Sequence, residues 1–325
     1  MRKSFFFLMT VLPLSLIAQF APEAGLPGST AMHADSSAFV AWATGCTVER
    51  GLQQIGNEGL GFASYGADAD GIGKADNMVV SLGDGGVATL TFSSNIVNEV
   101  GPDFAVFENG FHSTPHVFLE LAFVEVSSDG EHFFRFPAVS KVPADTQCGS
   151  FATMDASLIH NFAGKYEAFY GTPFDIDDIE DDALLDKNNI AYVRLIDVVG
   201  NIDSEYATYD SEGNPVNDPW PTPFASSGFD LDAVGVIHDL AHHNGLNEIG
   251  HDALSVFPNP TSGSLTVCSG AGSMCEIYDL LGQKVNAFVL DAEKAIIDLG
   301  NWDAGIYFVR VANHDKVYVE RIMKQ

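Results

Sequence analysis

Short apolar stretches separated by turns rich in glycine, asparagine and aspartate recur along residues 19–237. Val87–Phe92 alternates strictly, with Ala88, Leu90 and Phe92 on one face, and this period of two predicts a half-buried strand. Comparable stretches predict further strands over residues 77–82, 103–109, 118–127, 132–136, 190–198 and 229–237.

This regular spacing predicts an all-β fold, a jelly-roll-like β-sandwich over residues 19–237. The turn at residues 83–86, Gly-Asp-Gly-Gly, predicts a hairpin between the strands on either side of it. Helical periodicity is weak and is limited to short candidates near 155–169 and 178–186.

The pattern of apolar and polar residues changes after residue 237. Residues 238–252 are polar and lack alternation, so we interpret them as a linker. Residues 253–325 contain about seven short apolar strands separated by Pro-Asn-Pro, Leu-Gly-Gln and Ala-Gly turns, which predicts a second, small Ig-like β-sandwich.

The N-terminus has the pattern of a secretory signal peptide over residues 1–18. Arg2 and Lys3 precede an apolar run that ends at Ile17, and Ala18 offers a small residue at the cleavage site. No other stretch approaches eighteen apolar residues, so we expect no membrane span after removal of the signal.

Three motifs in the last segment are similar to a known family. FPNPTSG at 257–263, IYDLLGQKV at 277–285 and DAGIYFVRV at 303–311 resemble, in order and spacing, the type A C-terminal sorting domain of the Bacteroidetes type IX secretion system. The resemblance implies that residues 253–325 engage the secretion machinery, and that the protein crosses the outer membrane and reaches the cell surface.

Motifs of the first segment resemble an uncharacterised bacterial cell-surface family related to galactose-binding-like jelly rolls. The similar stretches are VSLGDGGVATLTF at 80–92, PDFAVFENG at 102–110, LAFVEVSSDG at 121–130, YVRLIDVVG at 192–200 and SGFDLDAVGVI at 227–237. This resemblance implies a structural Ca²⁺ and ligand binding through loops at one end of the sandwich.

The formal net charge of −29 belongs almost entirely to the first domain. Residues 19–250 hold 35 acidic and 7 basic side chains, which gives −28. Such a domain repels nucleic acid, which binds through Lys and Arg, and favours cations such as Ca²⁺. The alternative interpretation is an acidic surface that keeps an exported protein soluble.

Carboxylates at strand ends are the strongest candidates for Ca²⁺ ligands. Asp103, Glu108 and Asn109 bracket one predicted strand, and Asp230 and Asp232 open the last one at alternate positions, facing the same way. These acids could equally lie at exposed strand starts. A second candidate is the loop that carries Asp68, Asp70 and Asp76, although it lacks the complete EF-hand pattern.

A long loop between two core strands, residues 203–223, is rich in aromatic, proline and acidic residues. Tyr206, Tyr209 and Trp220, together with Trp42, could form a stacking surface for a sugar or another planar ligand. The same side chains could instead fill the end of the sandwich.

The four cysteines lie two in each domain. The simplest of three connectivities pairs Cys46 with Cys148 and Cys268 with Cys275, the second pair across a glycine-rich turn. An extracellular compartment would permit both disulfides.

These features favour a secreted binding protein, stabilised by Ca²⁺, for a glycan or small nutrient. The alternatives are a polysaccharide hydrolase and a structural or adhesive protein without a small ligand. Corrinoid capture is a narrower hypothesis that no residue of the sequence supports. The chain contains no GxSxG, HExxH, P-loop or GxGxxG motif after a strand, which argues against an enzyme.

Overall fold

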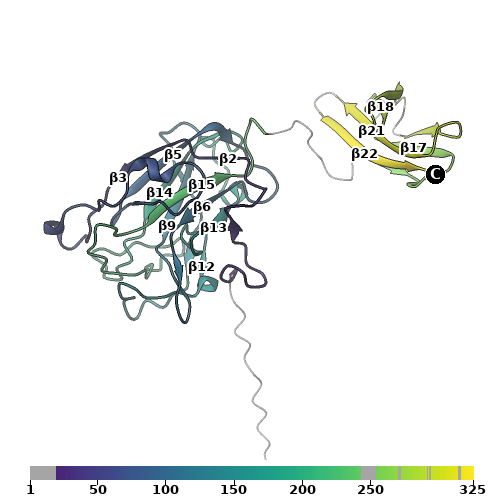
Figure 1. Cartoon of the computed structure of the whole chain (residues 1–325). Helices are drawn as coiled ribbons and strands as arrows, with labels where there is room; N and C mark the ends of the chain where they lie inside the picture. The colour runs from purple at the N-terminus through teal and green to yellow at the C-terminus, as the bar shows by residue number, and fades with distance from the viewer. Residues whose placement is uncertain (1–19, 243–253, 270–271, 291, 293, 314–315) are drawn as a thin grey trace, which may run out of the picture. The chain divides into compact units, whose positions relative to one another are not determined.

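The computed structural model describes residues 20–242 and 254–325, apart from residues 270–271, 291, 293 and 314–315 (Figure 1). The predicted signal peptide lies outside the described residues, as does most of the predicted linker. The chain divides into two compact units, residues 1–243 and 244–325. Each unit is described by itself.

The first unit is built from two antiparallel sheets, so the predicted all-β fold is confirmed. One sheet has the order β1 (Met32–His33), β13 (Tyr170–Phe174), β6 (Phe104–Glu108), β15 (Asp230–Val236), β2 (Ala41–Trp42), with β4 (Val80–Ser81) also paired to β15. The other has the order β10 (Phe134–Arg135), β9 (Ala122–Ser127), β14 (Ile190–Asp197), β5 (Val87–Ile96), β3 (Gly45–Glu49).

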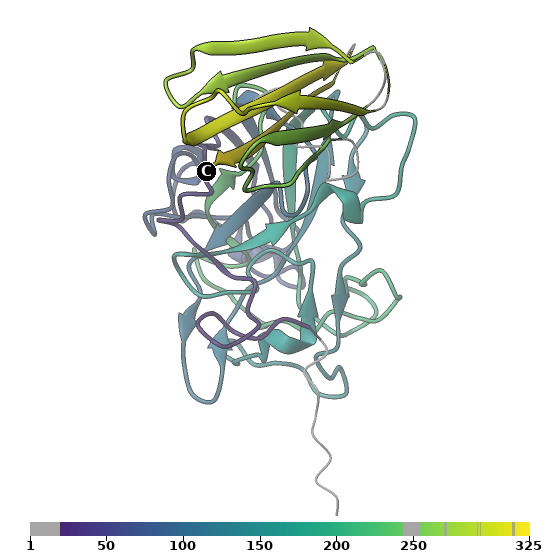
Figure 2. The same ribbon diagram turned by 90° about the vertical axis from the view of Figure 1, so that its right-hand side faces the viewer.

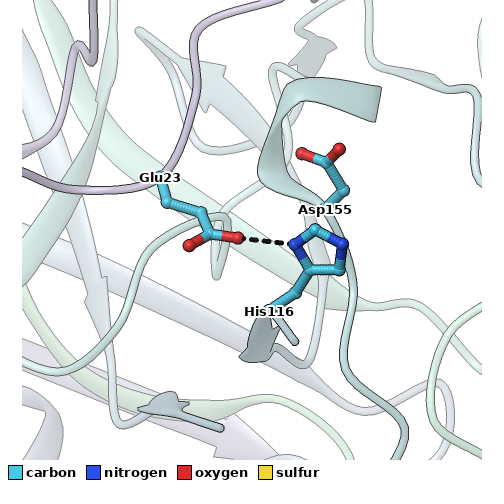
Figure 3. Close-up of side chains that lie close together, drawn as sticks. All are labelled: Glu23, His116 and Asp155. Atoms are coloured by element: carbon cyan, nitrogen blue, oxygen red, sulfur yellow. Dashed lines mark hydrogen bonds and ion pairs between the residues drawn. The ribbon is translucent and has the colours of Figure 1, made fainter. Parts of the chain in front are cut away.

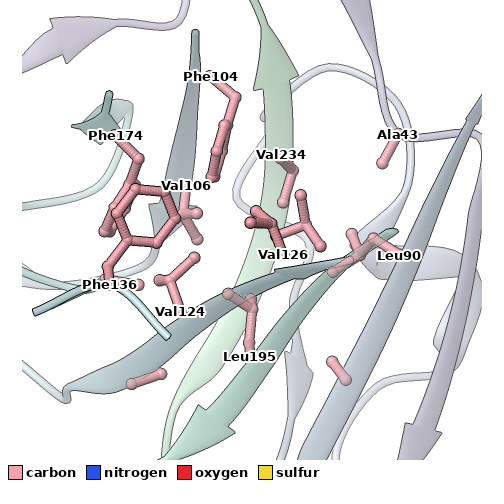
Figure 4. Close-up of a cluster of buried hydrophobic side chains, with 14 of the residues drawn as sticks. Ala43, Leu90, Phe104, Val106, Val124, Val126, Phe136, Phe174, Leu195 and Val234 are labelled. Atoms are coloured by element: carbon pink, nitrogen blue, oxygen red, sulfur yellow. The ribbon is translucent and has the colours of Figure 1, made fainter. Parts of the chain in front are cut away.

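Side chains from the facing sides of the two sheets form the main core (Figure 4). Phe104 of β6 stacks on Phe174 of β13 at 5.4 Å between ring centroids, and both pack against Phe136. The opposite face of β6 is covered as well, because Phe107 packs against Phe39 and Trp42. Burial on both faces explains the apolar run at the start of β6, and β9 and β15 are buried along their whole length although they carry Glu125, Asp230 and Asp232.

Short elements replace regular structure between these strands. Two small ladders join β7 (Phe111–His112) to β8 (Val117–Phe118) and β11 (Val139–Ser140) to β12 (Ile159–His160). The 3₁₀ turns are η1 (Glu58–Leu60), η2 (Asp68–Gly71), η3 (Ala156–Leu158) and η4 (Ile176–Asp178). The helix candidate near 155–169 is thus reduced to η3, and residues 179–189 form turns instead of the second candidate helix.

The predicted hairpin at residues 83–86 is wrong. β4 pairs with β15, whereas β5 pairs with β3 and β14 of the other sheet. The chain crosses between the layers because Leu82 and Gly83 donate backbone hydrogen bonds to Phe229 and Ser227, which draw the turn across the end of the sandwich. The glycine-rich turn is therefore a corner between two sheets.

The described residues of the second unit form seven strands in two sheets, as the turn spacing predicts; Figures 1 and 2 draw them in green to yellow. The first sheet is β16 (Ser255–Phe257), β17 (Ser264–Cys268), β20 (Lys294–Asp298), and the second is β19 (Lys284–Val289), β18 (Met274–Asp279), β21 (Gly305–Asn313), β22 (Lys316–Lys324). Its own core contains Leu265, Val267, Ile277, Val309 and Val311.

The four cysteines are free, so the structure does not form the two predicted disulfides. Cys268 and Cys275 are not hairpin partners, because β17 and β18 belong to different sheets. Cys275 is buried in the core, whereas Cys268 alternates away from the buried Leu265 and Val267. In the first unit, Cys46 lies on β3 opposite Leu90, and Cys148 lies in a loop where its N–H donates to Asn217.

The predicted linker starts too early. His238 contacts the Asp103 carboxylate through Nδ1 at 2.9 Å, and the buried Asp239 accepts a hydrogen bond from the backbone N–H of His242. Leu240 donates its N–H to Asn95. Residues 238–242 therefore belong to the first unit, because they complete hydrogen bonds at the end of β15.

We expect Phe104→Ala to lower the free energy of unfolding of the first unit by about 3–5 kcal/mol, because it leaves a cavity beside Phe136 and Phe174. Calorimetry should show the transition of the sorting unit unchanged, since that unit has a separate core. Val100→Ala is the control, because Val100 is 97% exposed and its truncation should have no effect. A shift of both transitions by F104A would contradict two independent cores.

Candidate functional site

Buried carboxylates are the unusual feature of the first unit. In its described part, eleven acidic side chains are buried against a single lysine, Lys165. Only Glu125 among them is held by two arginines, Arg135 and Arg194. The buried acids are Asp84, Asp103, Glu108, Glu120, Glu125, Asp197, Asp210, Asp218, Asp230, Asp232 and Asp239.

Most of these carboxylates accept hydrogen bonds from the backbone of loops. Asp197, at the end of β14, accepts the N–H groups of Gly85 and Phe229 at 2.9 and 2.7 Å. Asp218 accepts the N–H of Leu121 at 2.7 Å, in the interruption that divides the predicted strand 118–127 into β8 and β9. Buried loops carry backbone donors that no sheet satisfies, and the carboxylates supply the acceptors.

One end of the sandwich gathers six of these acids. Glu108 ends β6, Asp230 begins β15 and Asp197 ends β14, and the loops between strands add Asp84, Glu120 and Asp218. Burial raises the pKa of Glu120 well above its usual value, and the charges of Asp230, Glu108, Asp218 and Asp197 raise it further. Within the described part of the chain no side-chain hydrogen bond offsets these causes for Glu120, so its negative charge is poorly stabilised in this arrangement.

Two oxygens in this end of the sandwich are buried without a hydrogen-bond partner, Oε1 of Glu108 and Oδ1 of Asp218. The pKa of each carboxyl is raised well above its usual range, first by burial and then by neighbouring carboxylates. Within the part of the chain that the structure describes, no three of the six acids bring one oxygen each within 4.8 Å of one another. The group is thus a loose array of hard oxygen donors.

The structure brings together three of the five residues predicted as Ca²⁺ ligands. Asn109 donates its side-chain N–H to Asp230 at 3.0 Å, and the charge of Asp230 acts on Glu108. Asp103 lies at the opposite end of β6, where it accepts from Glu99 and Ile176 and contacts His238. Asp232 accepts from the backbone of Asp76 and Asn77 and holds that loop.

Glu120 and Asp218 are members of the array that sequence reasoning missed. Glu120 interrupts an apolar run, and a charged residue among apolar neighbours was the available signal. Asp218 lies far away in the sequence, and its hydrogen bond to Leu121 brings it into the array.

The alternative metal loop does not converge in the described residues. Asp68 accepts from Val48, Asp70 from Ala67 and Asp76 from Met78, each through a backbone N–H. These acids shape η2 and the turn after it.

The four aromatic candidates do not form one surface. Trp42 packs against Phe39 and Phe107 at 5.1 and 5.4 Å between ring centroids, as part of the core. Tyr206 lies against Gly56, and Trp220 donates its indole N–H to Asp84 at 3.4 Å. Asp84 also accepts the N–H of Ile55, so Trp220 is linked to the 55–56 loop through Asp84. Tyr209 is 47% exposed in a small bridge with Pro215.

A cavity of about 460 Å³ lies elsewhere in the first unit, beside β13. Its wall combines apolar side chains with a few polar groups: Phe20, Ala21, Met32, Pro102 and Pro173 on one hand, and Thr30, His160, Asn161, Lys165, Thr172, Asp175 and Asp178 on the other. Phe20 and His160 stack at 4.9 Å between ring centroids.

Two polar groups of this cavity stand out. The ammonium of Lys165 donates to the carbonyl of Ile159 at 2.7 Å, and burial lowers its pKa to about 8. The buried Oγ1 of Thr172 has no hydrogen-bond partner. A cavity of this size, largely apolar with a few polar groups, has the character of a small-molecule site.

The last segment of the chain has a known counterpart. Residues 255–325 match the family model described as the secretion system C-terminal sorting domain. This segment is a type IX secretion sorting domain. The protein is therefore exported by that system to the cell surface or beyond, and the sorting domain implies interaction with the secretion machinery. No helix among the described residues has the length and apolar character needed to cross a membrane.

Similarity to solved structures is weak. The chain is 14% identical to PorZ, a surface component of the type IX secretion system of Porphyromonas gingivalis, at a TM-score of 0.22, covering 76% of this chain and 30% of PorZ. A biofilm-associated protein BSP domain gives 9% identity, a TM-score of 0.21, and coverage of 74% and 48%. The β-glucuronidase of Ruminococcus gnavus gives 10% identity and a TM-score of 0.22, covering 86% of this chain and 45% of the enzyme.

This chain spans less than half the length of each of these proteins. TM-scores this low carry no inference about its fold or function. No curated protein matches the chain.

The buried acids predict a stability that falls as pH rises. Burial raises the pKa values of Asp84, Asp230 and Asp232 from 3.8 to about 6. Their contribution to folding is complete below about pH 4 and is lost as pH rises through about 6. For Asp84 the raised pKa corresponds to about 3 kcal/mol.

We expect Asp84→Asn to flatten the loss of unfolding free energy between about pH 5 and about pH 7, measured by urea denaturation with chelator present. The neutral amide still offers an oxygen to Ile55. Asp145→Asn, at an exposed position, is the matched control and should leave the slope unchanged. An unaltered slope in D84N would show that the buried Asp84 carboxylate does not lower the free energy of unfolding as pH rises.

Proposed function

We propose that the protein is a cell-surface binding protein whose first domain holds a glycan or another small polar nutrient in the cavity beside Lys165. The cavity itself is the observation that supports this function. Its apolar wall would shield the ligand from water, and the Lys165 ammonium together with the Asp175 and Asp178 carboxylates would orient it through hydrogen bonds.

The chemistry of this cavity favours a ligand with hydroxyl or carbonyl oxygens. Lys165 offers donors only, while Asp175 and Asp178 offer acceptors, and a polyhydroxylated molecule satisfies both kinds of group. The stacked pair of Phe20 and His160 adds a planar face of the kind that sugars pack against. This replaces the predicted aromatic platform, in which Trp42 is part of the core.

Binding is favoured over hydrolysis by the way the buried carboxylates are used. A glycosidase needs two carboxyl groups facing the scissile bond. Here Asp197 and Asp218 accept backbone N–H groups that hold loops, and a proton exchange with substrate would release those loops. Product analysis across a polysaccharide panel tests the hydrolase alternative, and released oligosaccharides would establish it.

We further propose that Ca²⁺ stabilises the loop end of the sandwich through Glu108, Glu120, Asp218 and Asp230. The unpartnered oxygens of Glu108 and Asp218 fit a hard cation, and Ca²⁺ completes its shell with carbonyls and water. A divalent charge would offset the mutual repulsion that raises the pKa of these carboxyls.

Asp178→Ala should weaken ligand binding by roughly tenfold with little loss of stability, because it removes an exposed acceptor from the wall of the cavity. The probe is a panel of neutral mono- and oligosaccharides, with affinity measured by calorimetry for whichever member binds. Tyr209→Ala, on the exposed loop, is the control. Loss of binding in Y209A but not in D178A would move the site to the aromatic loop, and no binding by any sugar would favour an adhesive or structural role.

Addition of CaCl₂ should raise the melting temperature of the first unit, and chelator should reverse the rise. At 100 times the dissociation constant the gain is about 2.7 kcal/mol. Glu120→Gln should abolish the response, whereas Asp70→Asn, in the alternative loop, should keep it. The reverse pattern would assign Ca²⁺ to the 68–76 loop, and no response in the wild type would exclude a stabilising Ca²⁺.

A further inference from the structure

Three side chains from distant parts of the sequence converge away from the carboxylate array (Figure 3). Glu23 comes from the N-terminal segment, His116 from the loop between β7 and β8, and Asp155 from the residue before η3. Each offers one ligand atom, and these atoms lie within 4.8 Å of one another. Among the described residues, no other group of three potential ligands meets this condition.

The donor set is one imidazole and two carboxylates. Oε1 of Glu23 lies 2.9 Å from Nδ1 of His116. Oδ1 of Asp155 accepts the backbone N–H of Ser157 at 2.9 Å, which leaves Oδ2 for another partner. In a tetrahedral zinc site, bonds of about 2.0–2.2 Å place ligand atoms roughly 3.3–3.6 Å apart, so small side-chain rotations would bring the three atoms into range.

We propose that Glu23, His116 and Asp155 form a binding site for a divalent transition-metal ion, with Zn²⁺ the best match. An imidazole nitrogen favours Zn²⁺ over Ca²⁺, which prefers a shell made only of oxygen. Three protein ligands leave a fourth position for water. All three residues are partly buried, so the ion can enter from solvent without opening the core.

The position of this site gives the ion a role in holding the N-terminal segment. Phe20 donates its backbone N–H to Ser157 of η3, and its ring stacks on His160 just beyond η3. Phe20 and Ala21 also line the cavity described above. A metal joining Glu23 to Asp155 would fix the segment that forms one wall of that cavity. The metal site itself does not depend on what the cavity binds.

A second histidine–carboxylate pair in the same unit shows how this cluster differs from an ordinary ion pair. His132 and Asp129 form a pair at 2.7 Å between Nδ1 and Oδ2, with a geometry like that of His116 and Glu23. That pair has no third ligand atom within the same distance in the described structure. It therefore serves as an internal control for a metal site that needs three ligands.

The test is Zn²⁺ binding to the purified protein, measured by calorimetry after metal removal, with Co²⁺ absorption as a report on ligand geometry. The wild type should bind one Zn²⁺ ion. His116→Gln should lower the affinity for this ion more than tenfold. His132→Gln should bind as wild type does.

Asp155→Ser supplies a second variant that keeps the cap of η3, because serine is also a good N-cap residue, but removes a ligand. D155S should also bind Zn²⁺ with more than tenfold lower affinity, and its Co²⁺ complex should lack the visible absorption bands of the wild type. Zn²⁺ affinity equal in wild type, H116Q and D155S would overturn the proposal, as would a site in the wild type that binds Ca²⁺ more tightly than Zn²⁺.

Discussion

The hydrogen bond from a loop backbone N–H to a buried carboxylate is the interaction on which the first domain depends. The two sheets are short, and several of their strands contain only two residues. Long connections therefore run through buried space, where an unsatisfied N–H is costly. Asp197, Asp218 and Asp232 each hold a loop in this way. Eleven of the acidic side chains that make the first domain so strongly charged are therefore buried parts of its structure.

This solution creates a second problem, because carboxylates that hold neighbouring loops repel one another. At the Glu108 end of the sandwich the raised pKa of Glu120 reflects burial and four nearby acids. Protonation or a divalent cation relieves that repulsion. The opposing demands of loop support and charge repulsion thus connect the acidity of the domain to its proposed cation dependence.

The candidate sites differ in how far the sequence could locate them. Glu108, Asn109 and Asp230 could be grouped in advance, because they lie at the ends of recognisable strands. Asp103 was misplaced, because a residue at the start of a strand and one at its end face opposite ends of a sandwich. Trp42 resembled a ligand-stacking residue until its packing on Phe39 and Phe107 was seen. In the sequence, an aromatic residue that stacks on a ligand cannot be told from one that packs in the core.

By itself the sequence determined what local patterns encode: an all-β chain, seven strands in the last segment, an acidic first domain and an export signal. Period-two alternation and turn residues are local properties, and the sorting motifs are contiguous. Only the tertiary structure decided that the turn at Gly83 crosses between sheets, that Cys268 and Cys275 are unpaired, and that Glu23, His116 and Asp155 converge. Those outcomes depend on long-range hydrogen bonds and side-chain packing, which bring together residues that no local pattern relates.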